Sequence, residues 1–236
     1  SQGGAQPADH EAQGLKALHP VVFPPPTPRA LIVCDLEATC WRAADDPELS
    51  ARQRDECEII EIGALRLDPE TLAEVGRFQR FVRPVRHPTL SAFCTELTHI
   101  QQADVDGGLP FAQAYAALVD WAGPTEAVDF VAWGHFDHRQ LAKEAAAAGL
   151  PEPAWAVSNA KVHFSDWWRW TTGKKVRLGQ SQALEALGLP PGQTPHRAIS
   201  DALDVARVLR IIWDPARGSA QAQAVLRPGG VVLLAT

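Results

Sequence analysis

The sequence predicts a single α/β domain in which a sheet and its helices form one sandwich. Three strand-like runs follow one another early in the chain, at 31–35, 58–67 and 76–82. Helical patterns then dominate and are interrupted by one further strand, at 128–133. The chain has 236 residues, of which 46% are apolar and 21% charged, enough for one sizeable core. This order of elements argues against a helical bundle and against an all-β fold.

The boundaries of the elements follow from local signals. Asp68-Pro69-Glu70 is a turn that joins the second and third strands as a hairpin, and Ser91 is placed as the N-cap of a short helix. A polar stretch at 42–56 is expected to be a long loop that borders the functional site. The expected helices cover 92–97, 111–121, the run from Phe136 to Gly149, 164–171, 179–188 and 197–213.

Both ends of the chain have a different composition from the middle. Residues 1–29 are rich in Pro, Gly and Ala and are expected to be a flexible arm that ends in polyproline II. The folded domain is placed at 30–213. The tail at 214–236 ends in an apolar run, which is either an edge strand or a disordered segment.

Charge and cysteine content narrow the class of protein. The net charge is −6, from 22 Lys and Arg against 28 Asp and Glu, which argues against a protein that coats nucleic acid through bulk positive charge. A local groove for nucleic acid is compatible with this balance. No apolar run is long enough for a membrane span, and no secretory signal is recognised at the start. Four cysteines without a C-x-x-C pair suit a reducing, cytoplasmic environment.

Two carboxylates end the first strand. Asp35 and Glu37 follow the apolar run 31–34, and because side chains alternate along a strand, both point to the same face of the sheet. Paired acids at the end of a buried strand are typical of a metal site.

Two later acids lie at the edge of an apolar helical stripe. Asp137 shares a face with Leu141 in its helix, and Asp201 lines up with Val205, so both are expected to face inward, whereas Asp204 is expected to be solvated. Taken alone, Asp137 is better explained as a helix N-cap. Inward carboxylates need a cation, and oxygen ligands without a His or Cys cluster favour Mg²⁺ or Mn²⁺ over zinc.

One histidine is placed to act on water at such a site. His196 precedes Asp201 by five residues, in the loop or first turn of the last helix. Its unperturbed pKa of about 6.5 makes it a candidate general base.

These residues form three motifs with a known counterpart. They are Asp35-Leu36-Glu37-Ala38-Thr39, Phe136-Asp137 and His196-Arg197-Ala198-Ile199-Ser200-Asp201. Together they resemble the motifs of the DnaQ-like 3′-to-5′ exonucleases in the form with histidine, which implies a ribonuclease-H-like fold with a mixed central sheet. The segments at 58–63, 81–84 and 93–98 are similar to the branch that contains histone-mRNA 3′-end and RNA-interference-related exoribonucleases.

The resemblance implies a mechanism and a substrate. Two divalent cations, held by Asp35, Glu37, Asp137 and Asp201, would activate water and steady the leaving 3′ oxygen, while His196 takes the proton. The partner would be a single-stranded RNA or DNA 3′ end, with nucleoside 5′-monophosphate as the product. By the same resemblance, Ala38 and Thr39 would meet the terminal ribose, and Trp41 or Phe136 would stack on a base.

A cationic and aromatic segment follows at 161–177. Its cations, Lys161, Lys174, Lys175 and Arg177 among them, suit a track for a single strand. The aromatic residues at 164–170 have two interpretations, base stacking and core packing, of which core packing is favoured.

Two other functions stay open. One is a DNA repair or proofreading exonuclease, because no residue can be assigned to read a 2′-hydroxyl. The other is a binding module that keeps the fold without catalysis, although such a module has no need to bury four acids.

Overall fold

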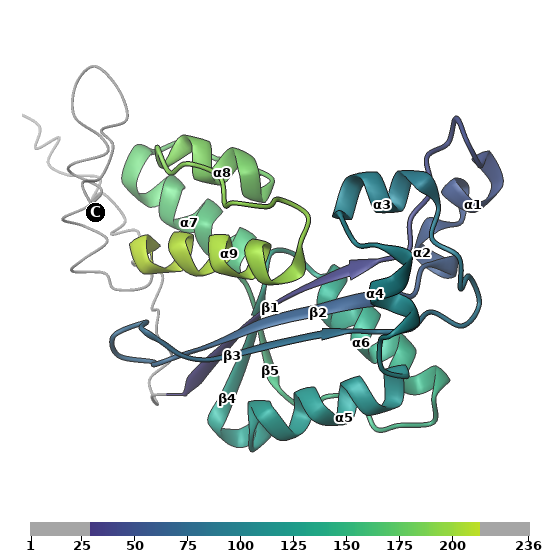
Figure 1. The fold of residues 1–236 in the computed structure, drawn as a ribbon. Coiled ribbons are helices and arrows are strands. Elements are labelled where there is room, and N and C mark those ends of the chain that lie inside the picture. Colours follow the sequence, from purple (N-terminus) through teal and green to yellow (C-terminus); the bar gives the residue numbers. More distant parts are fainter. Residues whose placement is uncertain (1–28, 213–236) are drawn as a thin grey trace, which may run out of the picture.

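The structure, a computed structural model, describes residues 29–212 and is built on one five-stranded mixed sheet (Figure 1). The strands lie in the order β3-β2-β1-β4-β5. The hairpin β2–β3 pairs antiparallel with β1, while β4 and β5 run parallel to β1. The bounds are β1 Ala30–Ala38, β2 Ile59–Leu67, β3 Glu74–Phe81, β4 Val128–Ala132 and β5 Ala156–Asn159.

Helices cover both faces of the sheet. In Figure 1, α5 and α6 lie below the sheet, α7, α8 and α9 lie above it, and four short helices gather near the end of β1. The bounds are α1 Pro47–Ala51, α2 Gln53–Glu56, α3 Ala92–Thr98, α4 Gln102–Asp106, α5 Phe111–Ala122, α6 Phe136–Ala147, α7 Ala160–Thr172, α8 Gln180–Ala186 and α9 Ala198–Ile212. No helix in this part of the chain is both long and apolar enough to cross a bilayer.

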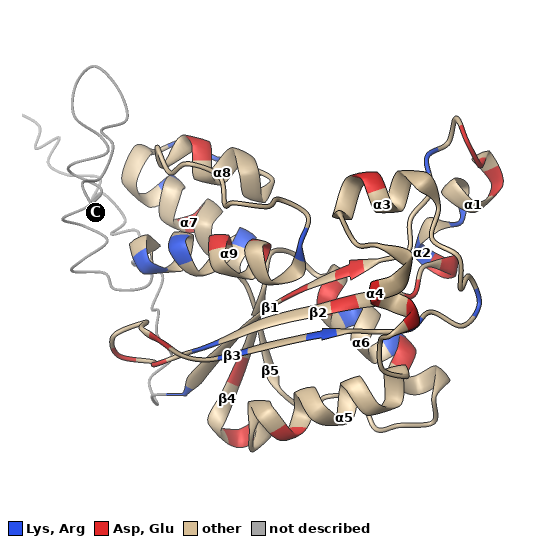
Figure 2. Ribbon diagram, in the orientation of Figure 1, with Lys and Arg blue, Asp and Glu red and all other residues tan. Residues whose placement is uncertain are grey.

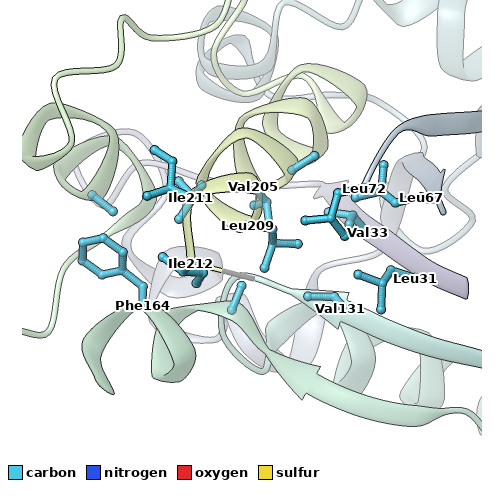
Figure 3. Close-up of a cluster of buried hydrophobic side chains, with 14 of the residues drawn as sticks. Leu31, Val33, Leu67, Leu72, Val131, Phe164, Val205, Leu209, Ile211 and Ile212 are labelled. Carbon is cyan, nitrogen blue, oxygen red and sulfur yellow. The ribbon is translucent and has the colours of Figure 1, made fainter. Parts of the chain in front are cut away.

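Strand β1 is buried on both sides, and its alternate residues feed two cores. Leu31 and Val33 pack with Leu209 of α9 and Phe164 of α7, as Figure 3 shows. Ile32 and Cys34 belong to the opposite core under α5 and α6. Each fully buried Leu, Ile or Val side chain contributes about 1.5–3 kcal/mol relative to exposure, so β1 is a rigid base for the acidic residues at its end.

Most expected elements are confirmed, and the exceptions share a physical reason. The hairpin, β1, β4, α5, α6 and α9 lie where the sequence places them. The expectation of a plain loop at 42–56 is wrong, since α1 and α2 lie there, and α4 and β5 were not expected. These elements have only four or five residues, and β5 is exposed or half-buried throughout, so no apolar period marks them.

The aromatic residues of α7 are core residues. Phe164 is fully buried, Trp167 is 5% exposed, and Trp168 and Trp170 pack against the same cluster. Core packing is therefore confirmed over base stacking for this helix face.

The expected arm at 1–29 and tail at 214–236 fall, except for Arg29, outside the described residues. Arg29 itself is anchored to the sheet, because its guanidinium pairs with Asp129 at 3.0 Å.

Candidate active site

The end of β1 carries the first two acids to one face of the sheet. Asp35 lies opposite Gly63 of β2, and Glu37 lies opposite Glu61. Both side chains are only partly buried, although the strand before them is fully buried. The strand thus emerges from the core at the point where the carboxylates begin.

Helix α9 approaches this face closely because β2 has a glycine there. A Cβ at Gly63 would lie 2.3 Å from the backbone N of Ile199 and 2.4 Å from the carbonyl C of Ala198. Only a residue without a side chain allows the first turn of α9 to rest on β2. That contact brings Asp201 over the two acids of β1, and carboxylate oxygens of Asp35, Glu37 and Asp201 lie within 4.8 Å of one another.

Asp137 reaches the same place from the other side of the sheet. It is the second residue of α6, 4% exposed, and its Oδ1 accepts a hydrogen bond from the backbone N of Leu36 at 3.0 Å. The N-cap of α6 is His135, so the interpretation of Asp137 as an N-cap is wrong. The fourth acid is instead fastened to β1 between Asp35 and Glu37.

Burial raises the pKa values of all four acids, and the charges of neighbouring acids add to this effect. Burial and the charges of Asp137 and Glu37 raise the pKa of Asp35 well above its usual range. Burial, together with Asp201, raises the pKa of Glu37 to about 9. Burial also raises the pKa of Asp137 to about 7 and that of Asp201 to about 6, in the second case against the opposing effect of His196.

The donor set fits a hard divalent cation. Among residues 29–212, no Lys or Arg forms an ion pair with any of these four carboxylates. Oxygen ligands that converge without a compensating cation are what Mg²⁺ and Mn²⁺ bind. In Figure 2, acidic residues colour the end of β1, the neighbouring end of β2 and α9.

A fifth acid in this region has a different role, which the sequence did not reveal. Glu61 is fully buried and accepts two hydrogen bonds from the Arg197 guanidinium, both at 3.0 Å, and one from the backbone N of Ala198 at 3.1 Å. It also accepts from Nε2 of Gln79 at 2.6 Å. Glu61 thus ties the start of α9 to β2. The available signal was an acid between two isoleucines, Ile60 and Ile62, in a buried strand.

His196 lies at the rim of the acid cluster. It is exposed, has a left-handed backbone with φ of 59°, and donates from its backbone N to Oδ2 of Asp201 at 3.2 Å. This turn leaves the imidazole free of the core and next to an acid of the cluster.

The expectation for Asp204 is wrong. Asp204 is 4% exposed, whereas Asp201 is partly exposed. The Asp204 carboxylate accepts from the backbone N of Gly192 at 2.9 Å and pairs with Arg207 at 2.8 Å. The loop before α9 folds back over this side of the helix, and helical periodicity alone does not reveal such a cover.

The residues expected to meet the substrate differ in how accessible they are. Thr39 is 2% exposed, and its hydroxyl accepts from the backbone N of Glu58 at 3.0 Å. Ala38 and Trp41 are partly exposed, and Trp41 meets the ring of His87 edge to face at 4.8 Å. Phe136 is 44% exposed, so its ring is accessible at the start of α6.

Three of the four expected cations line one groove. Lys161, Lys175 and Arg177 surround a cavity of about 800 Å³ together with His135, and Lys174 is an exposed neighbour of Lys175. The groove begins at the loop between β4 and α6, next to Asp137.

Comparison with known protein families gives a match over most of the described chain. The family model described as Exonuclease (RNase T type) matches residues 32–209. Human "ERI1 exoribonuclease 3" is 29% identical over 202 residues, which cover 81% of this chain and 56% of the relative. The Drosophila melanogaster "3′-5′ exonuclease Snipper" is 28% identical over 199 residues, covering 76% and 67%. This chain thus matches little more than half of the human relative's length.

Solved structures agree with this match. The nuclease domain of 3′hExo, described as a DEDDh family member bound to rAMP, has a TM-score of 0.65 at 27% identity and covers 80% of this chain and 94% of that one. A 3′-exonuclease that recognises the histone mRNA stem-loop also has a TM-score of 0.65, at 26% identity, with 80% and 65% covered. Exonuclease I, at 11% identity and a TM-score of 0.62, shares the fold. The ribonuclease-H-like fold and the resemblance to the histone-mRNA exonuclease branch are confirmed.

Proposed function

Because the chain belongs to the exonuclease family, whose model spans residues 32–209, we propose that it is a metal-dependent 3′-to-5′ exonuclease. Its substrate is the 3′ end of single-stranded nucleic acid, RNA in particular, and its product is nucleoside 5′-monophosphate. One observation carries this proposal: carboxylates from β1 and α9 converge within 4.8 Å without a cationic partner among the described residues, beside an exposed histidine.

The metal ligands in this proposal are Asp35, Glu37, Asp137 and Asp201. We assign them two divalent cations, Mg²⁺ or Mn²⁺. Bound there, such cations lower the pKa of a water molecule and stabilise negative charge on the phosphate and the leaving oxygen. The protein's own contribution is to hold the carboxylates together against their mutual repulsion, through the burial of β1 and the hydrogen bond from Leu36 to Asp137.

His196 is the general base in this mechanism. Its exposed position next to Asp201 suits a group that takes a proton from the attacking water and passes it to solvent. The hydrogen bond between the backbone N of His196 and Asp201 keeps the base at a constant place relative to a metal ligand.

The 3′ end is held by the end of β1 and by the start of α6. Ala38 and Thr39 present their backbone to the terminal ribose, while the Thr39 hydroxyl accepts a hydrogen bond from the backbone N of Glu58. Trp41 and Phe136 offer partly exposed rings on which bases can stack. Upstream phosphates follow the groove lined by Lys161, Lys175 and Arg177, with Lys174 beside it.

The preference for RNA rests on the relatives. Human "ERI1 exoribonuclease 3" is named for RNA, and the 3′hExo nuclease domain was solved with rAMP. The relative named only "3′-5′ exonuclease" leaves DNA as the second candidate substrate.

The test is digestion of matched 5′-labelled RNA and DNA strands in Mg²⁺, Mn²⁺ or EDTA. We expect a ladder that shortens from the 3′ end, faster on RNA, and no products in EDTA. Asp201→Asn is expected to lose at least a hundredfold in rate, whereas Asp204→Asn, a matched change on the same helix outside the cluster, retains activity. Full activity in Asp201→Asn would contradict the metal assignment, and a folded protein that binds but never cuts would favour a binding module.

A further inference from the structure

The backbone around Trp41 is held by a side chain of α2. Strand β1 ends at Ala38, so Trp41 lies beyond the end of the strand. Oε1 of Gln53 accepts a hydrogen bond from the backbone N of Trp41 at 3.2 Å. Nε2 of the same amide donates to the backbone O of Thr39 at 2.7 Å. A single glutamine therefore bridges the residues on the two sides of Cys40.

Thr39 is the fixed end of this bridge. Its backbone N donates to the O of Glu58 at 2.8 Å, and its hydroxyl accepts from the N of Glu58 at 3.0 Å. Glu58 directly precedes β2, and Thr39 is only 2% exposed. Thr39 is thus attached to the sheet independently of Gln53. The amide of Gln53 transmits that fixed position to Trp41, which is half-buried.

The ring of Trp41 is held by a second contact that also starts from α2. The rings of Trp41 and His87 meet edge to face, with centroids 4.8 Å apart. Nε2 of His87 lies 3.0 Å from Oε2 of Glu56, the last residue of α2. The backbone N of His87 donates to Oε2 of Glu58 at 2.9 Å. Because Trp41 stays half-buried with these contacts made, part of its indole remains accessible to a ligand.

Helix α2 makes these contacts without belonging to the core. It spans Gln53–Glu56 near the end of β1 (Figure 1), and none of these described residues is buried. Its first and last residues are half-buried, whereas the two between them are exposed. A helix this short is not stable by itself in water. The half-buried ends of α2 therefore face the chain around Trp41 and His87, where they have hydrogen-bond partners.

Trp41 lies close to the acid cluster along the chain. It follows Glu37 by four residues, so the two Cα atoms are at most about 14 Å apart. The terminal nucleotide of a strand bound at the acids is then within reach of the indole. Removing an aromatic ring on which a base stacks typically weakens binding by about fivefold to 150-fold. Stacking gives most affinity when the ring is already fixed before the ligand binds, because less conformational entropy is lost.

We propose that Gln53 is a positioning residue for the 3′-terminal base, because its bridge from Thr39 holds the Trp41 indole where that base stacks. This inference rests on the proposed exonuclease function, which places the 3′ end beside Trp41. Gln53 contacts the backbone of Trp41 and not the acids, so it acts on affinity for the base and leaves the chemical step unchanged.

The experiment uses two short 5′-fluorescent RNAs that differ only in the 3′-terminal residue, which is adenosine or an abasic ribose. Affinities are measured in EDTA, where no hydrolysis occurs, and kcat and KM are measured in Mg²⁺. The test variant is Gln53→Met, which keeps the length of the side chain and removes both hydrogen bonds. The same substitution is also made in Trp41→Ala.

A matched control is offered by Gln102. It is the first residue of a short helix, α4, and is half-buried, as Gln53 is in α2. Its Oε1 accepts from the backbone N of Leu90 at 2.8 Å, and its Nε2 donates to the backbone O of Pro88 at 2.8 Å. Gln102→Met therefore removes the same kind of bridge from a different segment of the chain.

We expect Gln53→Met to bind the RNA with terminal adenosine about threefold to tenfold more weakly, and the abasic RNA within about twofold of the unsubstituted protein. KM for the adenosine RNA rises by a similar factor while kcat changes less than about twofold, because the lost interaction is present in both ground state and transition state. Gln102→Met stays within about twofold on both RNAs. In Trp41→Ala, which has already lost the preference for adenosine, Gln53→Met has no further effect.

Four results would overturn the inference. Equal losses on both RNAs mean that Gln53 supports the whole site and not the base. No loss on either RNA means that Trp41 keeps its place without Gln53. A further loss in Trp41→Ala means that Gln53 acts through another residue, and an equal loss in Gln102→Met assigns the effect to general destabilisation. Urea unfolding of the two Met variants measures that destabilisation directly.

The proposed function can fail independently. If Gln53→Met loses affinity for the adenosine RNA alone but the unsubstituted protein shortens no RNA in Mg²⁺, the nuclease proposal fails and the positioning role remains. If the protein shortens RNA and Gln53→Met keeps the full preference for terminal adenosine, the positioning role fails alone.

Discussion

Replacing Arg197 by Met should separate the positioning of α9 from the chemistry of the acids. The guanidinium makes two hydrogen bonds to Glu61, each 3.0 Å long, and Arg197 immediately follows the proposed base, His196. The substitution keeps the length of the side chain and removes the charge and the donors. It leaves Glu61, which is fully buried, with the neutral donors Gln79 and Ala198.

The magnitude follows from that burial. Removing one partner of a buried ion pair typically costs about 3–5 kcal/mol, because the remaining charge is desolvated and unpaired. Such a loss is a large part of the roughly 5–15 kcal/mol by which a domain is stable. Arg197→Lys keeps the charge but cannot make the paired contact, so about 1–2 kcal/mol is expected. Glu61→Gln combined with Arg197→Met should recover much of the loss, since no buried charge remains.

The assay is urea unfolding, followed by hydrolysis rates at equal concentrations of folded protein. Arg207→Met is the matched control, because Arg207 pairs with the buried Asp204 on the same helix, away from the cluster. Both variants should lose stability, but only Arg197→Met should lose rate, by tenfold or more, as the start of α9 shifts with His196. A loss below about 1 kcal/mol with an unchanged rate would refute the claim that this pair positions α9.

Three further results are expected. Glu37→Gln should stabilise the protein in EDTA at pH 7 by up to about 3 kcal/mol, because burial raises the pKa of the Glu37 carboxyl to about 9 and folding of the unsubstituted protein must take up a proton. The same substitution should abolish Mg²⁺-dependent hydrolysis. The same raised pKa of Glu37 gives stability that is present below about pH 4.5 and is lost as the pH rises toward 9. Added Mg²⁺ should therefore raise the melting temperature more at pH 8 than at pH 5.5. Equal shifts of the melting temperature at both pH values would contradict this linkage. Gly63→Ala should destabilise the protein by about 1–3 kcal/mol or more and slow hydrolysis, because its Cβ meets the backbone N of Ile199, whereas Gly76→Ala, whose Cβ meets nothing nearer than 3.5 Å, should do neither.

The sequence predicts the acids of this site better than it predicts their surroundings. Alternation in β1 and the apolar stripe of α6 place Asp35, Glu37 and Asp137 correctly, because burial imposes a period on both elements. Asp204 was misplaced because its environment is the loop around Gly192, and contacts with a loop leave no period in the sequence. The short elements α1, α2, α4 and β5 escaped detection for the related reason that they bury few side chains.

The two cavities lined by cations beside the start of α6 could not be predicted as a unit. Arg54 and Arg139 are 85 residues apart in the sequence, and each alone is an ordinary surface arginine. Only the fold places them in one cavity and joins that cavity to the groove of α7 through His135. The single segment at 161–177 was recognisable because its charges are contiguous.

The pairing state of a buried acid distinguishes structure from function in this domain. Glu61 lies opposite Glu37 in the sheet and is more deeply buried, yet Arg197 neutralises it, which makes it a support for α9. Glu37 has no such partner within residues 29–212, and its pKa is raised to about 9. An unpaired and largely desolvated carboxylate costs stability, and a bound cation would offset that cost. The converse holds for Lys161, Lys175 and Arg177 in the groove beside α7, whose expected ligand is the polyanion that the acids are proposed to cut.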